Sequence, residues 1–284
     1  MKCCRLIPRL DIKGPNLVKG VHFEGLRVLG KPETFARNYF EQGADEIFFQ
    51  DTVASLYERE NLWTIVNNTA KEVFIPLTVG GGLRTLENIR QALSVGADKV
   101  ALNTAAINRP SFIEEAARVF GSSTIVVAIE TIKEEDGDYQ VFVENGREAT
   151  GVEAIGWAKE AERRGAGELV VSSIDRDGTG RGYDIQLLKA VTDSVSIPVV
   201  AHGGGGEAQQ ILEAIQSGGA DAVAPASMLH YGMLQPHHER SFHEVEGNVE
   251  FLKHGQGFSK FGDASIEKIK SCLQDGGVTV RVSS

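Results

Sequence analysis

The stretch IPLTVGGG (75–82) decides the fold, because it returns in the second half of the chain as IPVVAHGG (197–204). Farther along, GADKVALNTA (96–105) returns as GADAVAPASM (219–228). The matched pieces keep their order and nearly the same spacing. A repeat of this length predicts a chain made of two similar structural units.

Within each half, short apolar or β-branched runs alternate with amphipathic stretches, which predicts βα units around a parallel sheet. Many of the amphipathic stretches end at Gly, as helix C-termini prefer. We expect strands near residues 5–11, 46–51, 75–80, 98–102, 124–130, 168–173, 197–202 and 221–225.

Eight strands with eight helices predict a (β/α)8 TIM barrel built from two (β/α)4 halves, a fold of about 250 residues. We expect one domain over residues 1–284, with an insertion at about 232–264 before the last helix. A doubly wound sheet is the alternative, but it does not explain a twofold repeat of four units.

The composition is that of a packed globular protein. The 284 residues carry 29 Lys and Arg against 39 Asp and Glu, and the net charge of −10 argues against nucleic acid as the main partner. No apolar run approaches the roughly 18 residues of a membrane span, and the chain start does not resemble a secretory signal. The three cysteines suit neither a disulfide framework nor a metal site. We expect a cytoplasmic protein without a metal ion.

Glycine-rich loops follow two of the predicted strands, as Gly80–Gly82 and Gly203–Gly206. In a barrel, the loops after the strands form the functional face, and their backbone amides can hold phosphate without a charged side chain. The next βα loops, Asn103–Thr104 and Ala226–Ser227, would complete the two sites. The sequence therefore predicts a substrate that carries two phosphates.

Two carboxylates are expected at the ends of opposite strands, Asp11 on the first and Glu130 on the fifth. Carboxylates on two sides of a substrate suit a general acid and a general base. The alternative for each is an ordinary surface carboxylate at a strand end.

The motifs LDIKGPNLVKGVHFEGLR (10–27), TVGGGLRT (78–85), SSIDRDGTGRGYD (172–184) and HGGGG (202–206) resemble the cyclase subunits (HisF) of imidazole glycerol phosphate synthase. The resemblance covers most of the chain. It implies ammonia supplied by a glutaminase (HisH-type amidotransferase) subunit in a heterodimer, and no cofactor. The implied reaction converts a two-phosphate aminoimidazole-carboxamide ribonucleotide to imidazole glycerol phosphate and aminoimidazole carboxamide ribonucleotide.

The same resemblance implies roles for individual residues. Asp11 and Glu130 match the catalytic pair, although the family has aspartate in place of Glu130, and Lys19 is expected on a flexible loop. Positions that match substrate or phosphate binders are Lys19, Asp51, Gly81, Gly82, Asn103, Thr104, Ser172, Asp177, Gly178, Gly203, Gly204, Ala226 and Ser227. The family also has a ring of charges at the far end of the barrel that admits ammonia, and Arg5, Glu46, Lys99 and Glu168 match it. From their spacing alone, we expect these four residues to form an inward salt-bridge ring.

Arg9 departs from the family pattern, which has a small cysteine there. Inward positions recur at every second residue of a strand, so Arg9 should point into the barrel together with Asp11. Because an unpaired buried guanidinium is costly, we expect Arg9 to pair with Asp11 or Glu130 and to lower the pKa of its partner. We hypothesise that Arg9 and Glu130 changed together.

Two further features leave alternatives open. His202 either binds phosphate or fills space, and the histidines of segment 232–264 have no common metal-site spacing, so a surface insertion or partner contact is expected. For the whole chain, one alternative is an accessory subunit that conducts ammonia from a glutaminase to an amide- or amidine-forming synthetase in surface-sugar biosynthesis. Another is the sister isomerase of histidine biosynthesis, which needs no glutaminase.

Overall fold

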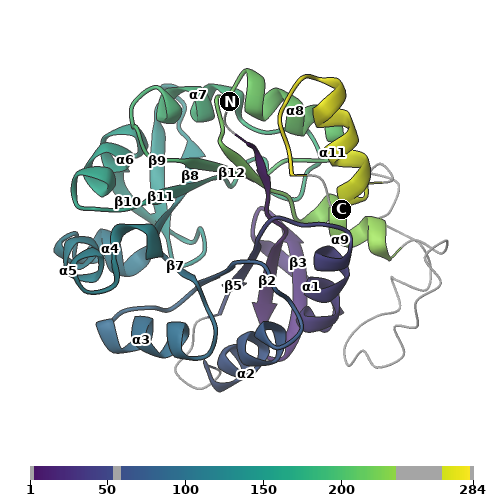
Figure 1. Ribbon diagram of the computed structural model, residues 1–284. Coiled ribbons are helices and arrows are strands. Elements are labelled where there is room, and N and C mark those ends of the chain that lie inside the picture. Colours follow the sequence, from purple (N-terminus) through teal and green to yellow (C-terminus); the bar gives the residue numbers. More distant parts are fainter. Residues whose placement is uncertain (1–2, 54–58, 235–263, 282–284) are drawn as a thin grey trace.

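The computed structural model describes residues 3–53, 59–234 and 264–281. Its central sheet is a closed ring (Figure 1), in which each barrel strand pairs in parallel with the next and β1 pairs with β13. The barrel strands are β1 (Arg5–Leu6) with β2 (Arg9–Lys13), β5 (Ile47–Asp51), β6 (Leu77–Gly80), β7 (Lys99–Leu102), β8 (Ile125–Lys133), β11 (Glu168–Ser173), β12 (Val199–His202) and β13 (Ala222–Ala224). The predicted barrel is confirmed.

Helices surround this ring (Figure 1). They are α1 (Pro32–Glu41), α2 (Arg59–Ala70), α3 (Leu86–Ser94), α5 (Ser111–Phe120), α6 (Ala154–Arg163), α7 (Ile185–Thr192), α8 (Ala208–Gln216) and α11 (Ile266–Asp275). Their apolar faces pack on the strands and form the main core. Two short helices, α4 (Thr104–Asn108) and α9 (Ser227–Met233), follow the last barrel strand of each half. No helix in the described residues is long and apolar enough to cross a membrane.

The first predicted strand, 5–11, is interrupted in the structure by Ile7 and Pro8. Pro8 has no N–H to donate, which divides the strand into β1 and β2. The ring remains continuous, because the N–H of Ile7 donates to the Val223 carbonyl (2.9 Å) and the N–H of Phe48 donates to the Pro8 carbonyl (3.0 Å).

Each half also carries an antiparallel hairpin that was not among the strands expected from the sequence. Strands β3 (Asn16–Val21) and β4 (Glu24–Gly30) extend β2, and β9 (Tyr139–Val143) and β10 (Glu148–Glu153) extend β8. Lys19 lies on β3 and is buried, so its placement on a flexible loop was wrong.

The two hairpins share the geometry of their tips. His22 and Phe23 have φ values of 53° and 60°, and Glu144 and Asn145 have 51° and 59°. Successive positive φ values are typical of tight hairpin turns, where glycine or asparagine usually supplies them. The twofold repeat therefore extends to elements in which the two halves have different sequences.

The interior of the barrel is layered. Its middle is an apolar layer made of Ile7, Phe48, Ala101, Val126, Val170, Val200, Ala222 and Ala224. Polar side chains lie on both sides of this layer, and those on the C-terminal side of the strands belong to the candidate active site.

Aspartates join neighbouring strands at the N-terminal end of the barrel. The carboxylate of Asp45 accepts the N–H of Leu6 at 2.8 Å. The same contact joins Asp98 to Leu77 (2.8 Å) and Asp221 to Val199 (3.0 Å). In each pair, the N–H of the aspartate also donates to the carbonyl of its partner, which fixes the register of the two strands.

Candidate active site

The two glycine loops have similar backbones at the C-terminal end of the barrel. Gly81 and Gly82 have φ values of 103° and 64°, and Gly203 and Gly204 have 86° and 110°. A Cβ atom on Gly81 would lie 2.4 Å from the Asp51 carbonyl oxygen. These positions therefore require glycine for both backbone conformation and space.

The residues predicted to complete the phosphate sites are equivalent too. Asn103 (φ −128°, ψ −91°) precedes α4, and Ala226 (φ −127°, ψ −82°) precedes α9. Thr104 and Ser227 then open these helices, whose first backbone N–H groups are unpaired within the helix and suit an anion. Phosphate binding at both loops stays a prediction.

A recess of about 60 Å³ opens at the first-half loop. Its lining includes Gly82, Asn103 and Thr104 together with Asp51 and Glu130. The recess therefore joins a predicted phosphate site to a predicted catalytic carboxylate.

Four charged side chains, Arg9, Asp11, Lys19 and Asp177, form a buried ion cluster at the C-terminal end of the barrel. The Lys19 ammonium donates to Asp11 at 3.0 Å and to both carboxylate oxygens of Asp177 at 3.0 Å. Nε of Arg9 donates to the second oxygen of Asp11 at 2.9 Å. All four side chains are almost fully buried. The expectation that Arg9 pairs with a carboxylate is confirmed, and the partner is Asp11.

The cluster fixes the charge of its members. Burial by itself raises the pKa of Asp11, but the nearby Lys19 and Arg9 cations hold that pKa below its usual value. The pKa of Lys19 is raised because Asp11 and Asp177 outweigh the effect of its burial. Asp11 is therefore an ionised carboxylate that can accept a proton or hydrogen bond.

Glu130 has the opposite character. Burial raises its pKa to about 7, and Arg9 only partly opposes that effect because its hydrogen bond goes to Asp11. Oε2 of Glu130 is buried and has no hydrogen-bond partner among the described residues. Glu130 is thus able to hold a proton near neutral pH, as a general acid must.

The β3–β4 hairpin covers this cluster. The N–H of His22 donates to the Asp177 carbonyl at 3.0 Å, and a Cβ atom on Gly178 would lie 2.5 Å from the Gly20 carbonyl oxygen. Gly178 therefore allows the close approach of the hairpin. Of the predicted pocket residues, Ser172 lies on β11 in register with Glu130 and has a buried Oγ without a partner among the described residues.

His202 is buried and contacts groups of the chain itself, and phosphate binding by its ring stays a prediction. Its Nδ1 lies 2.7 Å from the Ala224 carbonyl oxygen, its Nε2 lies 3.5 Å from Oδ1 of Asp177, and its ring stacks on Phe23 at 6.4 Å between centroids. Burial lowers the pKa of His202, so the ring is mainly neutral. It supports the ion cluster and the hairpin tip.

Two aromatic residues of the site were missed from sequence. Phe23 packs against Arg9, Lys19 and His202. The one sequence feature that could have pointed to it is its position in the family-like motif of residues 10–27. His230 on α9 bonds to the Arg9 carbonyl oxygen through Nε2 (3.0 Å) and to the Tyr39 hydroxyl through Nδ1 (2.7 Å). Burial lowers the pKa of His230 to about 3, so it acts as a neutral support for β2.

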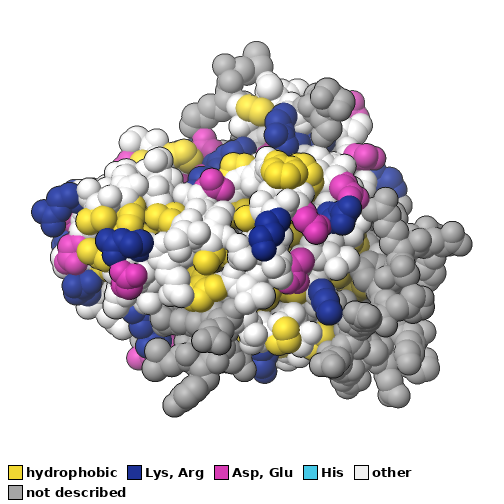
Figure 2. All heavy atoms as spheres, turned by 60° about the horizontal axis from the view of Figure 1, so that its bottom comes forward, with side chains coloured by type: hydrophobic (Ala, Val, Ile, Leu, Met, Phe, Trp, Pro, Cys, Tyr) yellow, Lys and Arg dark blue, Asp and Glu magenta, His cyan; other side chains and the backbone are white. Residues whose placement is uncertain are grey.

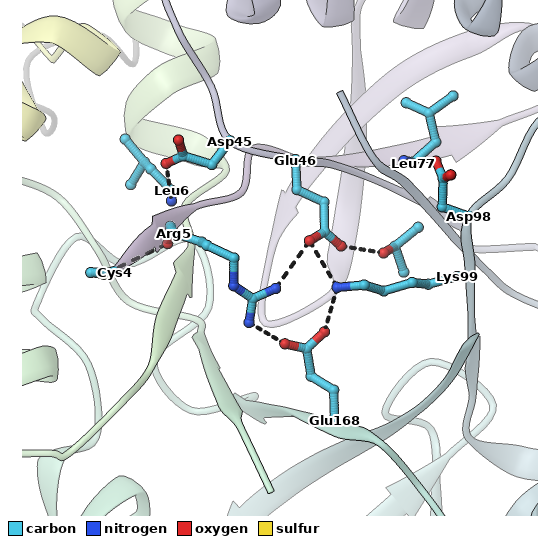
Figure 3. Close-up of polar contacts among 10 residues, drawn as sticks. Cys4, Arg5, Leu6, Asp45, Glu46, Leu77, Asp98, Lys99 and Glu168 are labelled. Atoms are coloured by element: carbon cyan, nitrogen blue, oxygen red, sulfur yellow. Dashed lines mark hydrogen bonds and ion pairs between the residues drawn. The ribbon is translucent and has the colours of Figure 1, made fainter. Parts of the chain in front are cut away.

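The four predicted ring charges meet at the N-terminal end of the barrel (Figure 3). The Lys99 ammonium lies 2.9 Å from Glu46 and 2.9 Å from Glu168, and Arg5 pairs with the same two carboxylates. The salt-bridge ring expected from the spacing is confirmed. Its place in an ammonia path stays a prediction.

The described residues contain no group of three or more His, Cys, Asp or Glu side chains arranged to hold a metal ion. The predicted insertion at 232–264 lies almost entirely outside the described residues.

The fold and the site define a (β/α)8 barrel with two repeated glycine loops on either side of two opposed carboxylates. Residues 5–235 match the family described as histidine biosynthesis protein, and the chain belongs to this family. Similar curated proteins are each named imidazole glycerol phosphate synthase subunit HisF. The one from Legionella pneumophila is 53% identical over 74% of this chain and 99% of its own length. Those from Alkaliphilus metalliredigens and Nostoc are 46% and 48% identical, over 85% and 81% of this chain and 96% and 90% of their own lengths.

Proposed function

We propose that this chain is a cyclase subunit of imidazole glycerol phosphate synthase and acts in histidine biosynthesis in the cytoplasm. Its substrate is the two-phosphate aminoimidazole-carboxamide ribonucleotide, and its nitrogen source is ammonia. The observation that carries the proposal is the pair of opposed carboxylates, Asp11 on β2 and Glu130 on β8, between the two glycine loops.

The protonation states of this pair suit the reaction. When ammonia replaces a carbonyl oxygen, one group accepts a proton from nitrogen and another donates a proton to the departing oxygen. Asp11 is held ionised by its cations and serves as the acceptor. Glu130, with a pKa raised to about 7 by burial, serves as the donor.

Binding at the two ends positions the substrate between these groups. One phosphate binds Gly81, Gly82 and the start of α4, and the other binds Gly203, Gly204 and the start of α9. Holding both ends fixes the reacting carbons relative to the carboxylates, which replaces a diffusional encounter by an oriented one. Lys19 exchanges one of its carboxylate partners for an anionic group of the substrate.

The ammonia-producing partner is a glutaminase subunit on the N-terminal face, where the charge ring closes the barrel. An exposed aromatic side chain, Phe74, lies at this end just before β6; it is 77% exposed and packs against Phe40 at 6.1 Å between ring centroids. Exposed aromatic groups are enriched in protein interfaces. Basic and acidic side chains are interspersed on the face displayed in Figure 2, which does not suit a nucleic acid polymer.

The test uses the purified full chain, ammonium salt and the linear two-phosphate ribonucleotide. We expect release of aminoimidazole carboxamide ribonucleotide, and its loss in Asp11→Asn and Glu130→Gln. Arg37→Gln, which changes an exposed ion pair on α1, is the matched control and should keep full turnover. If the intact chain gives no product, the proposal is wrong.

One observation favours a second candidate function. Arg9 donates a hydrogen bond to one oxygen of Asp11, and its positive charge lowers the basicity of this carboxylate. A chain that binds the glutaminase and raises its activity, yet gives no product from the ribonucleotide, would be the accessory subunit that delivers ammonia to a separate synthetase.

A further inference from the structure

Arg9 lies between the interior of the barrel and the hairpin that covers its mouth. Its side chain is 2% exposed. Its Cζ lies 5.5 Å from the ring centroid of Phe48, which belongs to the apolar layer, and 5.5 Å from that of Phe23, which is at the hairpin tip. The guanidinium is therefore held between two aromatic rings, one from each region.

The guanidinium is also close to the barrel axis. It bonds to Asp11 on β2 and acts electrostatically on Glu130 of β8 and His202 of β12. Strands β2 and β8 lie on opposite sides of the ring, so a group that acts on both lies between them. Below Arg9 are the apolar layer and then the ring formed by Arg5, Glu46, Lys99 and Glu168.

We propose that Arg9 is an inner barrier to ammonia, placed between the basal charge ring and the catalytic carboxylates and held there by Phe23. The inference rests on the proposed function, because only a barrel supplied from its N-terminal face needs ammonia to move along the axis. A fixed guanidinium repels ammonium ion, so the species that passes is neutral ammonia. Its buried Nη2, which has no hydrogen-bond partner among the described residues, is the donor that ammonia meets.

The role of Phe23 follows from its contacts. Phe23 packs on the guanidinium as closely as Phe48 does, and it stacks on His202 at the same time. Lys19 lies on the same hairpin, so a substrate that replaces Asp11 or Asp177 as its partner removes a contact that holds the hairpin in place. Movement of the hairpin therefore releases one side of Arg9, and the barrier weakens when the catalytic site is being used.

The test compares two nitrogen sources in the complex with the glutaminase subunit. The measured quantity is the ratio of kcat with glutamine to kcat with ammonium salt. Ammonia from the salt can enter from the C-terminal side without passing the charge ring, whereas ammonia from glutamine enters from the N-terminal face. Arg9→Ala removes the barrier, and we expect the ratio to rise by about threefold or more. Loss of the contact with Asp11 slows the chemical step for both sources and cancels in the ratio.

Arg9→Met is the matched control, because it also removes the charge and the Asp11 contact but keeps a long side chain on the axis. We expect its ratio to stay near that of the unchanged protein. Phe23→Ala, which leaves Arg9 and its charge in place, should raise the ratio in the same direction as Arg9→Ala.

Three results overturn the inference. The first is an unchanged ratio in Arg9→Ala, and the second is an equal rise in Arg9→Met, which would assign the effect to the lost charge and not to the long side chain on the axis. An unchanged ratio in Phe23→Ala removes the role of the hairpin. Absence of product from both nitrogen sources in the unchanged protein is a different result, because it contradicts the proposed function itself and the inference with it.

Discussion

The raised pKa of Glu130 predicts how stability depends on pH. The folded protein holds the proton of this carboxyl up to a pKa of about 7, whereas the usual value is 4.5. Between these values only the unfolded chain releases the proton, so the free energy of unfolding falls as pH rises through this window and then levels off. At 1.36 kcal/mol for each pH unit, the loss is about 3 kcal/mol. The glutamine side chain of the Glu130→Gln variant has no proton to release, so this variant should not lose stability in the window.

Urea unfolding at several pH values between 5 and 8, followed by fluorescence of the buried Trp63 and Trp157, measures this difference. We expect Glu130→Gln to gain stability over the unchanged protein as pH rises from 5 to about 7, by about 2.5 kcal/mol, and little more above pH 7. Val170→Ala, an uncharged change in the apolar layer, is the control and should shift stability equally at every pH. A difference for Glu130→Gln that is constant from pH 5 to 8 would refute the reasoning.

Three other substitutions test the site. Lys19→Met leaves two buried carboxylates without their shared cation, so urea unfolding should show a loss of about 3–5 kcal/mol, and unchanged stability would contradict the ion cluster. Gly178→Ala places a Cβ 2.5 Å from the Gly20 carbonyl oxygen, so amide exchange in the β3–β4 hairpin should accelerate while exchange in the barrel strands stays slow. Gly204→Ala places a Cβ 2.2 Å from the Gly182 carbonyl oxygen at a φ of +110°, so calorimetry should show weaker binding of inorganic phosphate; full affinity would contradict the phosphate site.

The barrel itself was predictable because its signals are local and repeated. Glycine loops, helix ends and apolar runs recur in both halves, and each constrains a short stretch of chain. The β3–β4 hairpin gave no such signal, whereas Asn145-Gly146 in the β9–β10 turn is a typical hairpin signal that our sequence interpretation did not use. The first five residues of β4 are exposed or half-buried, and the β3–β4 turn uses His22 and Phe23 with positive φ where glycine or asparagine would have marked a turn.

Parts of the site followed from strand geometry, and parts did not. Arg9 and Asp11 are two residues apart on one strand, so alternation places them on the same face, and their pairing was predictable. The contact of Lys19 with Asp177 joins residues 158 positions apart and depends on how the hairpin folds back. Burial raises the pKa of Glu130, and it stays raised because Arg9 forms its hydrogen bond with Asp11 and not with Glu130. Strand alternation does not predict which of the two carboxylates Arg9 binds.

The aspartate contacts at the base of the barrel repeat at every second strand rather than once in each half. Each of the four strand pairs has an equivalent position at the base of its second strand. Three of these positions hold Asp45, Asp98 and Asp221, and the fourth holds Gly167, whose N–H still donates to the Ile125 carbonyl at 2.9 Å. A Cβ atom on Gly167 would lie 2.2 Å from the Ser122 carbonyl oxygen, in the turn that enters β8. The basal hydrogen bonds thus have a fourfold pattern beneath the twofold pattern of the glycine loops. The aspartate is missing only from the first strand pair of the second half, so these basal hydrogen bonds repeat with every pair of strands, a quarter of the barrel at a time.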